Sequence, residues 1–146
     1  MKVSFHNSIE EISKKSWDAL IGDLNYPFLR HDFLKTLEIT NCVGTNTGWI
    51  PIHITIERDE ELIAAMPLYL KSHSQGEFVF DHSWANAFYQ HGLDYYPKLV
   101  SSIPHTPASG PRFLMKDGEE KSVLFEKIKE GVKMLSLIHI SEPTRR

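Results

Sequence analysis

The chain has 146 residues, a net charge of −3 and one cysteine. Its hydrophobic content of 41% and charged content of 24% are typical of one soluble globular domain. No cluster of Lys and Arg forms the basic stripe of a nucleic-acid surface, so DNA is not expected as a partner.

Cellular location is inferred from what the sequence lacks. A single cysteine, Cys42, excludes an intramolecular disulfide and indicates a reducing compartment. No window approaches the roughly 20 apolar residues of a membrane span, so no transmembrane segment is expected. Polar residues interrupt the N-terminus at once, which argues against a signal peptide. A cytoplasmic location is the expectation.

The first forty residues predict a short strand and two amphipathic helices. Met1–Phe5 alternates and indicates an edge strand. Asn7 or Ser8 is the expected cap of a helix that ends at Gly22, and Ser8 precedes Glu11 at the spacing of a capping box. A second helix is predicted from about Pro27 to Thr40. The residues expected on the apolar sides of the two helices are Ile9, Ile12, Trp17, Leu20 and Ile21, then Phe28, Phe33, Leu34, Leu37 and Ile39.

Two consecutive apolar strands, Trp49–Arg58 and Glu61–Lys71, form the centre of the predicted fold. Every second residue of the first is apolar, which predicts a half-buried strand. The second is apolar on both faces and predicts a covered central strand. Residues 58–61 lack an Asn-Gly or Asp-Gly pair, so we expect a loose four-residue turn. Pro67 cannot donate to a sheet and predicts a bulge or a stop in pairing.

Shorter elements are expected after this hairpin. Phe78-Val79-Phe80 is a predicted aromatic strand, and Trp84–Gln90 a predicted helix with Asp81 or Ser83 as its cap. The remaining expected elements are an extended segment at residues 94–100, a proline-rich loop at 101–111, a short strand at 112–115 and a helix at 119–134, with Val123, Leu124, Ile128 and Val132 facing inward. This order predicts an α+β, or mixed α/β, fold class.

The last residues have a composition of their own. Residues 135–145, Leu-Ser-Leu-Ile-His-Ile-Ser-Glu-Pro-Thr-Arg, correspond to translated transposon-end and adapter DNA from sequencing libraries. Residues 135–146 are therefore expected to be a tail of non-native origin, which is left out of fold reasoning. The alternative is a genuine strand at residues 135–140.

Three common kinds of site lack a sequence signature. The histidines are scattered without a metal-binding pair, and the closest grouping, His73, Glu77, Asp81 and His82, is explained as ordinary polar loop residues, so no metal is expected. Cys42 has no adjacent base and is expected to be a semi-buried thiol. Neither glycine-rich phosphate motif occurs, so no cofactor site is expected within these residues.

A dense set of polar and aromatic residues remains between positions 73 and 112. Aromatic faces beside a few fixed charges suit a cleft for a polar, ring-bearing or peptide-like ligand. Ordinary packing of the aromatic residues, with the basic ones solvated, is the alternative. The candidate substrate-binding residues are His73, Glu77, Asp81, Trp84, Tyr95, Tyr96, Lys98, Thr106 and Arg112.

Several short motifs follow one another in a compatible order from about Trp17 to Arg112. They include Ala64-Ala65-Met66-Pro67-Leu68-Tyr69-Leu70-Lys71, Tyr95-Tyr96-Pro97-Lys98-Leu99 and Thr106-Pro107. Together with residues 27–38, 43–49 and 71–85 they resemble the FemAB-like branch of the GNAT acyltransferase superfamily, whose members are often labelled "peptidoglycan biosynthesis/recognition". His105 departs from the phenylalanine usual before Thr-Pro in that family.

The resemblance implies a GNAT-like mixed sheet with flanking helices and transfer of an acyl or aminoacyl group to an amine. The donor it implies is acyl-CoA or aminoacyl-tRNA, and the acceptor is a small-molecule or peptide-like amine linked to peptidoglycan. Asp81 or His73 is expected to take or relay a proton, while Tyr95, Tyr96 or Arg112 binds the acceptor and Trp84 forms a wall. No single catalytic residue is assigned.

Members of this family are longer and contain two GNAT-like halves. Residues 1–134 are therefore expected to be a partial N-terminal domain, whose partner is the missing C-terminal half of the same protein and which is inactive alone. Such a piece is expected to be poorly soluble because it exposes a strand edge. The alternative function is a non-catalytic GNAT-fold module that binds a peptidoglycan precursor or a peptide-like ligand.

Overall fold

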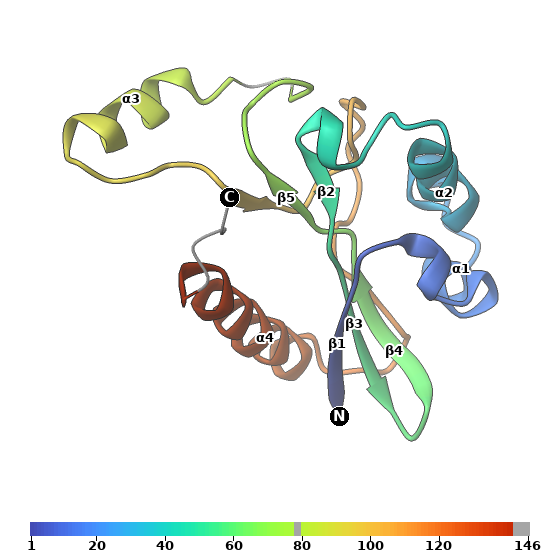
Figure 1. The fold of residues 1–146 in the computed structure, drawn as a ribbon. Helices are drawn as coiled ribbons and strands as arrows, with labels where there is room; N and C mark the ends of the chain where they lie inside the picture. The colour runs from blue at the N-terminus through green and yellow to red at the C-terminus, as the bar shows by residue number, and fades with distance from the viewer. Residues whose placement is uncertain (78–79, 142–146) are drawn as a thin grey trace.

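Two antiparallel sheets and four α-helices make up residues 1–77 and 80–141, the part of the chain that this computed structural model describes (Figure 1). The helices are α1 (Lys14–Ile21), α2 (His31–Ile39), α3 (His82–Gln90) and α4 (Lys121–Ser141). Sheet A contains, in spatial order, β1 (Lys2–His6), β3 (His53–Arg58), β4 (Glu61–Met66) and β7 (Leu114–Met115). Sheet B contains β2 (Trp49–Pro51), β5 (Tyr69–Lys71) and β6 (Lys98–Val100). The predicted α+β class is confirmed.

The predicted central hairpin is present, but it is shared between the two sheets. β2 and β3 are separated by Ile52, and β4 and β5 by Pro67 and Leu68. The Ile52 N–H donates to the Leu68 carbonyl at 2.9 Å, which keeps the two halves of the hairpin together across this break. The expectation that pairing stops at Pro67 is confirmed, because a proline has no N–H to donate. All described strand pairs are antiparallel, whereas the resemblance implied a single mixed sheet.

Helices cover both faces of sheet A, with α1 and α2 on one side and α4 on the other (Figure 1). On the α4 side, Ile54 and Ile56 pack against Leu124 and Ile128. The prediction that the first strand is half-buried is wrong, because every residue from 51 to 56 is buried. The cover for its second face comes from helices that are distant in sequence. Gly131 lets α4 approach closely, since a Cβ there would lie 3.0 Å from Val3.

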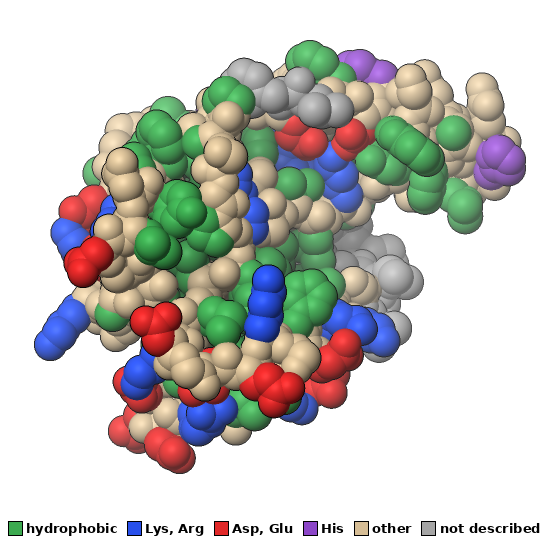
Figure 2. Space-filling model, turned by 180° about the vertical axis from the view of Figure 1, so that it is seen from behind, with side chains coloured by type: hydrophobic (Ala, Val, Ile, Leu, Met, Phe, Trp, Pro, Cys, Tyr) green, Lys and Arg blue, Asp and Glu red, His purple; other side chains and the backbone are tan. Residues whose placement is uncertain are grey.

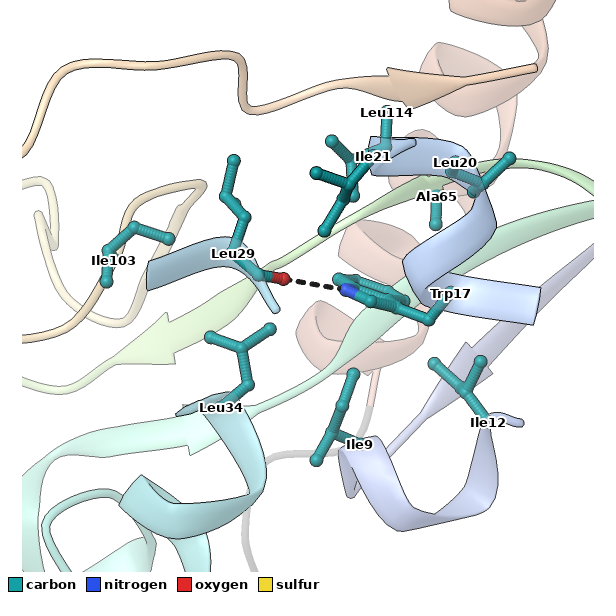
Figure 3. Packing of buried hydrophobic residues seen from close by; sticks show 10 residues of the cluster. All are labelled: Ile9, Ile12, Trp17, Leu20, Ile21, Leu29, Leu34, Ala65, Ile103 and Leu114. Carbon is teal, nitrogen blue, oxygen red and sulfur yellow. Dashed lines mark hydrogen bonds between the residues drawn. The ribbon is translucent and has the colours of Figure 1, made fainter. Parts of the chain in front are cut away.

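The core on the opposite side is built around Trp17 (Figure 3). Its ring is fully buried, and its indole N–H donates to the Leu29 carbonyl at 2.8 Å. A buried tryptophan needs such a partner because its N–H would otherwise lose its hydrogen bond to water. The same contact ties α1 to the segment that precedes α2. The neighbouring side chains are Ile9, Ile12, Leu20, Ile21, Leu34, Ala65, Ile103 and Leu114 (Figure 3).

The hairpin turn is tighter than predicted. Arg58 pairs directly with Glu61, so only Asp59 and Glu60 form the turn. Both have positive φ, 51° and 64°, which are the signs of the type I′ turn that suits a twisted hairpin. The expectation of a loose four-residue turn is wrong because the strand pairing imposes this geometry on residues other than Asn and Gly.

Both N-terminal helices are interrupted where the sequence predicted continuous ones. A 3₁₀ turn at Ile9–Glu11, capped by Ser8, precedes α1, which has its own cap in Ser13. Gly22 ends α1 with φ 59°, as predicted. A second 3₁₀ turn, Pro27–Leu29, is separated from α2 by Arg30 in an extended conformation.

The C-terminal elements agree with prediction more closely. Asp81 occupies the N-cap position of α3, although its side chain makes no capping hydrogen bond. Helix α4 runs through residue 141, so the alternative strand at 135–140 is wrong. Val123 is 40% exposed and does not face inward as expected. The predicted strand Phe78-Val79-Phe80 includes residues 78 and 79, which lie outside the described residues.

Helix α3 and the segments that flank it extend away from the two sheets (Figure 1). Ala85 is the one buried residue of this helix. Hydrophobic side chains gather on the surface of this projection (Figure 2). Those with large exposed fractions are Phe80, Trp84, Phe88, Tyr89 and Leu93. An exposed apolar surface of this kind favours association with another surface.

Candidate functional site: a charged and aromatic cluster on sheet B

One face of sheet B carries a row of three side chains, contributed by neighbouring strands. Trp49 of β2 is paired with Lys71 of β5, and Lys71 is paired with Lys98 of β6. Residues directly opposite each other in antiparallel strands point to the same face. The sheet therefore brings one aromatic ring and two basic groups together from three separate parts of the sequence.

Lys98 is the centre of this cluster. Its ammonium group donates to Glu77 Oε2 at 2.8 Å and also contacts the Asp81 carboxylate. The rings of Tyr95 and Tyr96 lie 5.6 and 5.8 Å from the ammonium nitrogen, within the range of cation–π attraction. The side chains of Lys98, Glu77 and Asp81 are each less than one-fifth exposed. These contacts fix Lys98 and join the N-terminus of α3 to β6.

Lys71 lies deeper in the same cluster and is fully buried. Its ammonium nitrogen lies 3.9 Å from the centre of the Trp49 ring and donates to the Gln75 carbonyl at 2.7 Å. Burial lowers the pKa of Lys71 from 10.5 to about 8; the nearby Glu77 opposes this change and Lys98 adds to it. Lys71 consequently titrates closer to neutral pH than an exposed lysine does.

Glu77 has one carboxylate oxygen engaged and one free. Oε2 accepts from Lys98, whereas Oε1 is buried and accepts no hydrogen bond from the described residues. A buried carboxylate oxygen without a donor is unfavourable and is uncommon in native structures. A hydrogen bond from an additional N–H donor to this oxygen would therefore be favourable.

The structure brings five of the nine predicted site residues into this cluster: Glu77, Asp81, Tyr95, Tyr96 and Lys98. His73 is adjacent, because its Nδ1 accepts from the Gln75 N–H at 3.2 Å and Gln75 also binds Lys71. Trp84 is on the projecting helix α3 and is 67% exposed.

Thr106 and Arg112 belong to the proline-rich loop before β7. The Thr106 hydroxyl donates to the Pro104 carbonyl at 3.0 Å. Arg112 lines a pocket together with Tyr26 and Phe28. These two residues are therefore placed at a second location, outside the contacts of the Lys98 cluster.

Sequence reasoning missed a buried polar group between β3 and α2. Glu38 binds His53, the Ser8 hydroxyl and the Ile9 N–H, at 3.1, 2.6 and 3.0 Å. The Tyr69 hydroxyl is buried near His53 without a partner among the described residues. No short motif identifies this group, because its members are distant in sequence. Burial raises the pKa of Tyr69, and the charge of Glu38 adds to this effect.

Other predicted features can be placed as well. Cys42 is exposed, so the expectation of a semi-buried thiol is wrong. His73, Glu77, Asp81 and His82 do not form a metal-binding group, and no set of three suitable ligands occurs among the described residues. No described helix has the length and apolar character needed to cross a membrane.

The model of the FemAB-like family, described as peptidoglycan biosynthesis/recognition, matches residues 8–140. The chain belongs to the FemAB-like family. The matched range contains both the Lys98 cluster and the Arg112 pocket, and it extends into the C-terminal residues for which an adapter origin was predicted. That origin remains a prediction. No curated protein and no solved structure matches this FemAB-like chain.

Proposed function

We propose that this FemAB-like chain takes part in transferring an acyl or aminoacyl group to an amine acceptor of peptidoglycan metabolism, and that Glu77 receives the acceptor amine. The observation that carries the proposal is the buried Glu77 Oε1, which has no donor among the described residues. An amine N–H is a suitable donor for this oxygen. The family description supports a peptidoglycan-related role.

The proposed reaction needs an oriented amine and an acceptor for its proton. The amine nitrogen attacks the acyl carbon, a C–N bond forms, and the C–S bond of an acyl-CoA or the C–O bond of an aminoacyl-tRNA breaks. The amine proton passes to Glu77, which then gives it to the leaving thiolate or alkoxide. Lys98 holds Glu77 in place through its contact with Oε2. The tyrosines beside Lys98 offer aromatic faces to the acceptor.

A binding role without transfer is the second candidate function. It is favoured by the contacts of Lys98, because its ammonium group already forms ion pairs with both Glu77 and Asp81. In that case Glu77 would bind the amine of a peptidoglycan precursor and take no proton from it. The donor would then have no role.

Release of free thiol from acyl-CoA tests the two functions. The assay uses this chain and a longer FemAB-like protein, with and without a precursor peptide that carries a free amine. Amine-dependent release that Glu77→Gln lowers at least tenfold supports transfer, and Glu57→Gln on sheet A is the matched control. Aminoacyl-tRNA is assayed in parallel as the other donor. Amine binding without release from either donor, in both proteins, contradicts transfer and supports the binding module.

A further inference from the structure

A pocket lies at the proline-rich loop before β7, separate from the contacts of Lys98. It has a volume of about 410 Å³ and is lined by the segment from Asn25 to Leu29 and by Ile103, Pro107, Ala108, Ser109 and Arg112. A volume of this size accommodates a small organic ligand. The Tyr26 and Phe28 side chains give the pocket an aromatic wall, and Asn25 and Ser109 add neutral polar groups.

Arg112 is the one charged residue of this lining. Its guanidinium donates to three backbone carbonyls, those of Ala108 at 2.6 Å, Gly110 at 3.1 Å and Pro111 at 3.4 Å. Carbonyls are neutral, so these bonds orient the side chain without compensating its charge. No carboxylate of the described residues forms an ion pair with Arg112, whereas Arg58 binds both oxygens of Glu119.

The guanidinium has N–H groups to spare. Arginine has five donors, and three of those of Arg112 are used by its own loop. The described residues leave the others free for an acceptor from outside the chain. A positive charge beside free N–H donors and an aromatic wall is the arrangement that binds a carboxylate attached to an apolar or peptide-like group.

The loop that carries Arg112 is held in its conformation by packing. Pro107 and Pro111 restrict its backbone, and Gly110 has φ 153°. A Cβ at Gly110 would lie 3.1 Å from the Tyr26 ring, so the loop rests directly on the aromatic wall. Because the carbonyls that orient Arg112 belong to the same loop, the pocket is formed before a ligand enters it, which reduces the entropy lost on binding.

We infer that this pocket is a binding site for a small peptide-like ligand with a free carboxylate, held by Arg112 and packed on Tyr26 and Phe28. A single arginine without a second cation fits a singly charged carboxylate better than a doubly charged phosphate. The inference rests on the proposed function in one respect: the bound carboxylate is taken to belong to the acceptor molecule that also carries the amine.

Binding of N-acetyl-alanyl-alanine and of its C-terminal amide, measured by titration calorimetry without any acyl donor, tests the inference. The two probes differ only in the charge of the terminal group. The acid is expected to bind the intact chain at least tenfold more tightly than the amide. Arg112→Gln is expected to remove this preference. Phe28→Ala is expected to weaken the binding of both probes and to leave the ratio of their affinities unchanged.

Arg30→Gln is the matched control, because Arg30 also donates to backbone carbonyls but does not line the pocket. It is expected to retain the preference for the acid. Thermal melting of each variant identifies any loss of folding, and Arg112→Lys, which keeps the charge, is expected to retain part of the preference. Equal binding of acid and amide by the intact chain, an unchanged preference in Arg112→Gln, or equally tight binding of inorganic phosphate would overturn the inference. Transfer at Glu77 is measured separately, so either idea can fail alone.

Discussion

The buried side chain of His53 lies 3.1 Å from the Glu38 carboxylate, measured from Nε2 to Oε1. The Leu68 N–H points at Nδ1 of the same ring, at 3.4 Å, so Nδ1 is the acceptor and Nε2 carries the hydrogen given to Glu38. This pair connects α2 to β3. Ser8 and the Ile9 N–H complete the shell of donors around the carboxylate.

Replacing Glu38 is therefore expected to destabilise the fold. Glu38→Gln lowers the free energy of unfolding by roughly 2–3 kcal/mol, because hydrogen bonds to a charged, half-buried acceptor are weakened or lost. Urea unfolding at pH 7 measures the change. Glu10→Gln is the control: Glu10 is exposed and, among the described residues, forms an ion pair with Lys35 alone, so its loss costs less than about 1 kcal/mol. Equal effects of the two substitutions would contradict a structural role for Glu38.

Glu38 also predicts a dependence of stability on acid pH. Burial by itself raises the pKa of Glu38, but the hydrogen bonds from His53, Ser8 and the Ile9 N–H outweigh burial and hold the pKa below its ordinary value of 4.5. The stabilisation is present above pH 4.5 and is lost as the pH falls through the lower pKa of the folded state. The intact chain should lose more stability than Glu38→Gln when both are unfolded at pH 5 and pH 3.

The lowered pKa of Lys71 predicts how the free energy of unfolding changes at alkaline pH. Its folded pKa is about 8 and its ordinary value is 10.5, so the unfolded chain binds more protons between these values. The free energy of unfolding should rise between pH 8 and pH 10, by an amount on the order of 1 kcal/mol. Lys71→Met should lack this rise. A profile that is the same in both proteins would show that Lys71 titrates as an exposed lysine does.

The hairpin turn offers a substitution that should stabilise the protein. Glu60 has φ 64°, a conformation that glycine adopts without strain. Glu60→Gly should raise the free energy of unfolding by about 0.5–1 kcal/mol, since Asp-Gly is a favoured pair for this turn. Glu60→Ala, which keeps a Cβ, should give no such gain. A loss of stability in Glu60→Gly would mean that the Glu60 side chain contributes more than its strained backbone costs.

Exposure of Trp84 can be measured by fluorescence. Trp17 and Trp49 are at most 1% exposed, whereas Trp84 is 67% exposed. Iodide should quench one class of tryptophan, and Trp84→Phe should remove that class. Retention of the quenchable fraction in Trp84→Phe would place the exposed tryptophan elsewhere. Scattered light from the two proteins at equal concentration then reports how far α3 contributes to the expected poor solubility.

Patterns of neighbouring residues predicted most helices and strands, because the residues that end an element, such as Gly22 for α1 and Pro67 for β4, act within a few positions of the chain. They could not predict that residues 51–56 are buried on both faces. That depends on α4, whose Leu124 and Ile128 pack against Ile54 and Ile56 from far along the chain. Period-two patterns describe one strand and contain no information about a second covering layer.

The cluster shows the same limit. Tyr95, Tyr96 and Lys98 could be selected as candidates from their residue types, but the register that places Lys98 opposite Lys71 could not be predicted. Register between β5 and β6 cannot be read from either strand alone. The sequence alone does not single out Lys71, because its strand is apolar, or Glu38, because its partner His53 belongs to another element.

The order β1-β3-β4-β7 has a consequence for synthesis on the ribosome. β4 has its outer neighbour only in Leu114–Met115, some fifty residues later in the chain. Until those residues emerge, the edge of β4 in the nascent hairpin is unpaired. The apolar side chains of the hairpin are not yet covered by α4 either. During that interval a chaperone, or another nascent chain, can bind the row of backbone groups with which β7 later pairs.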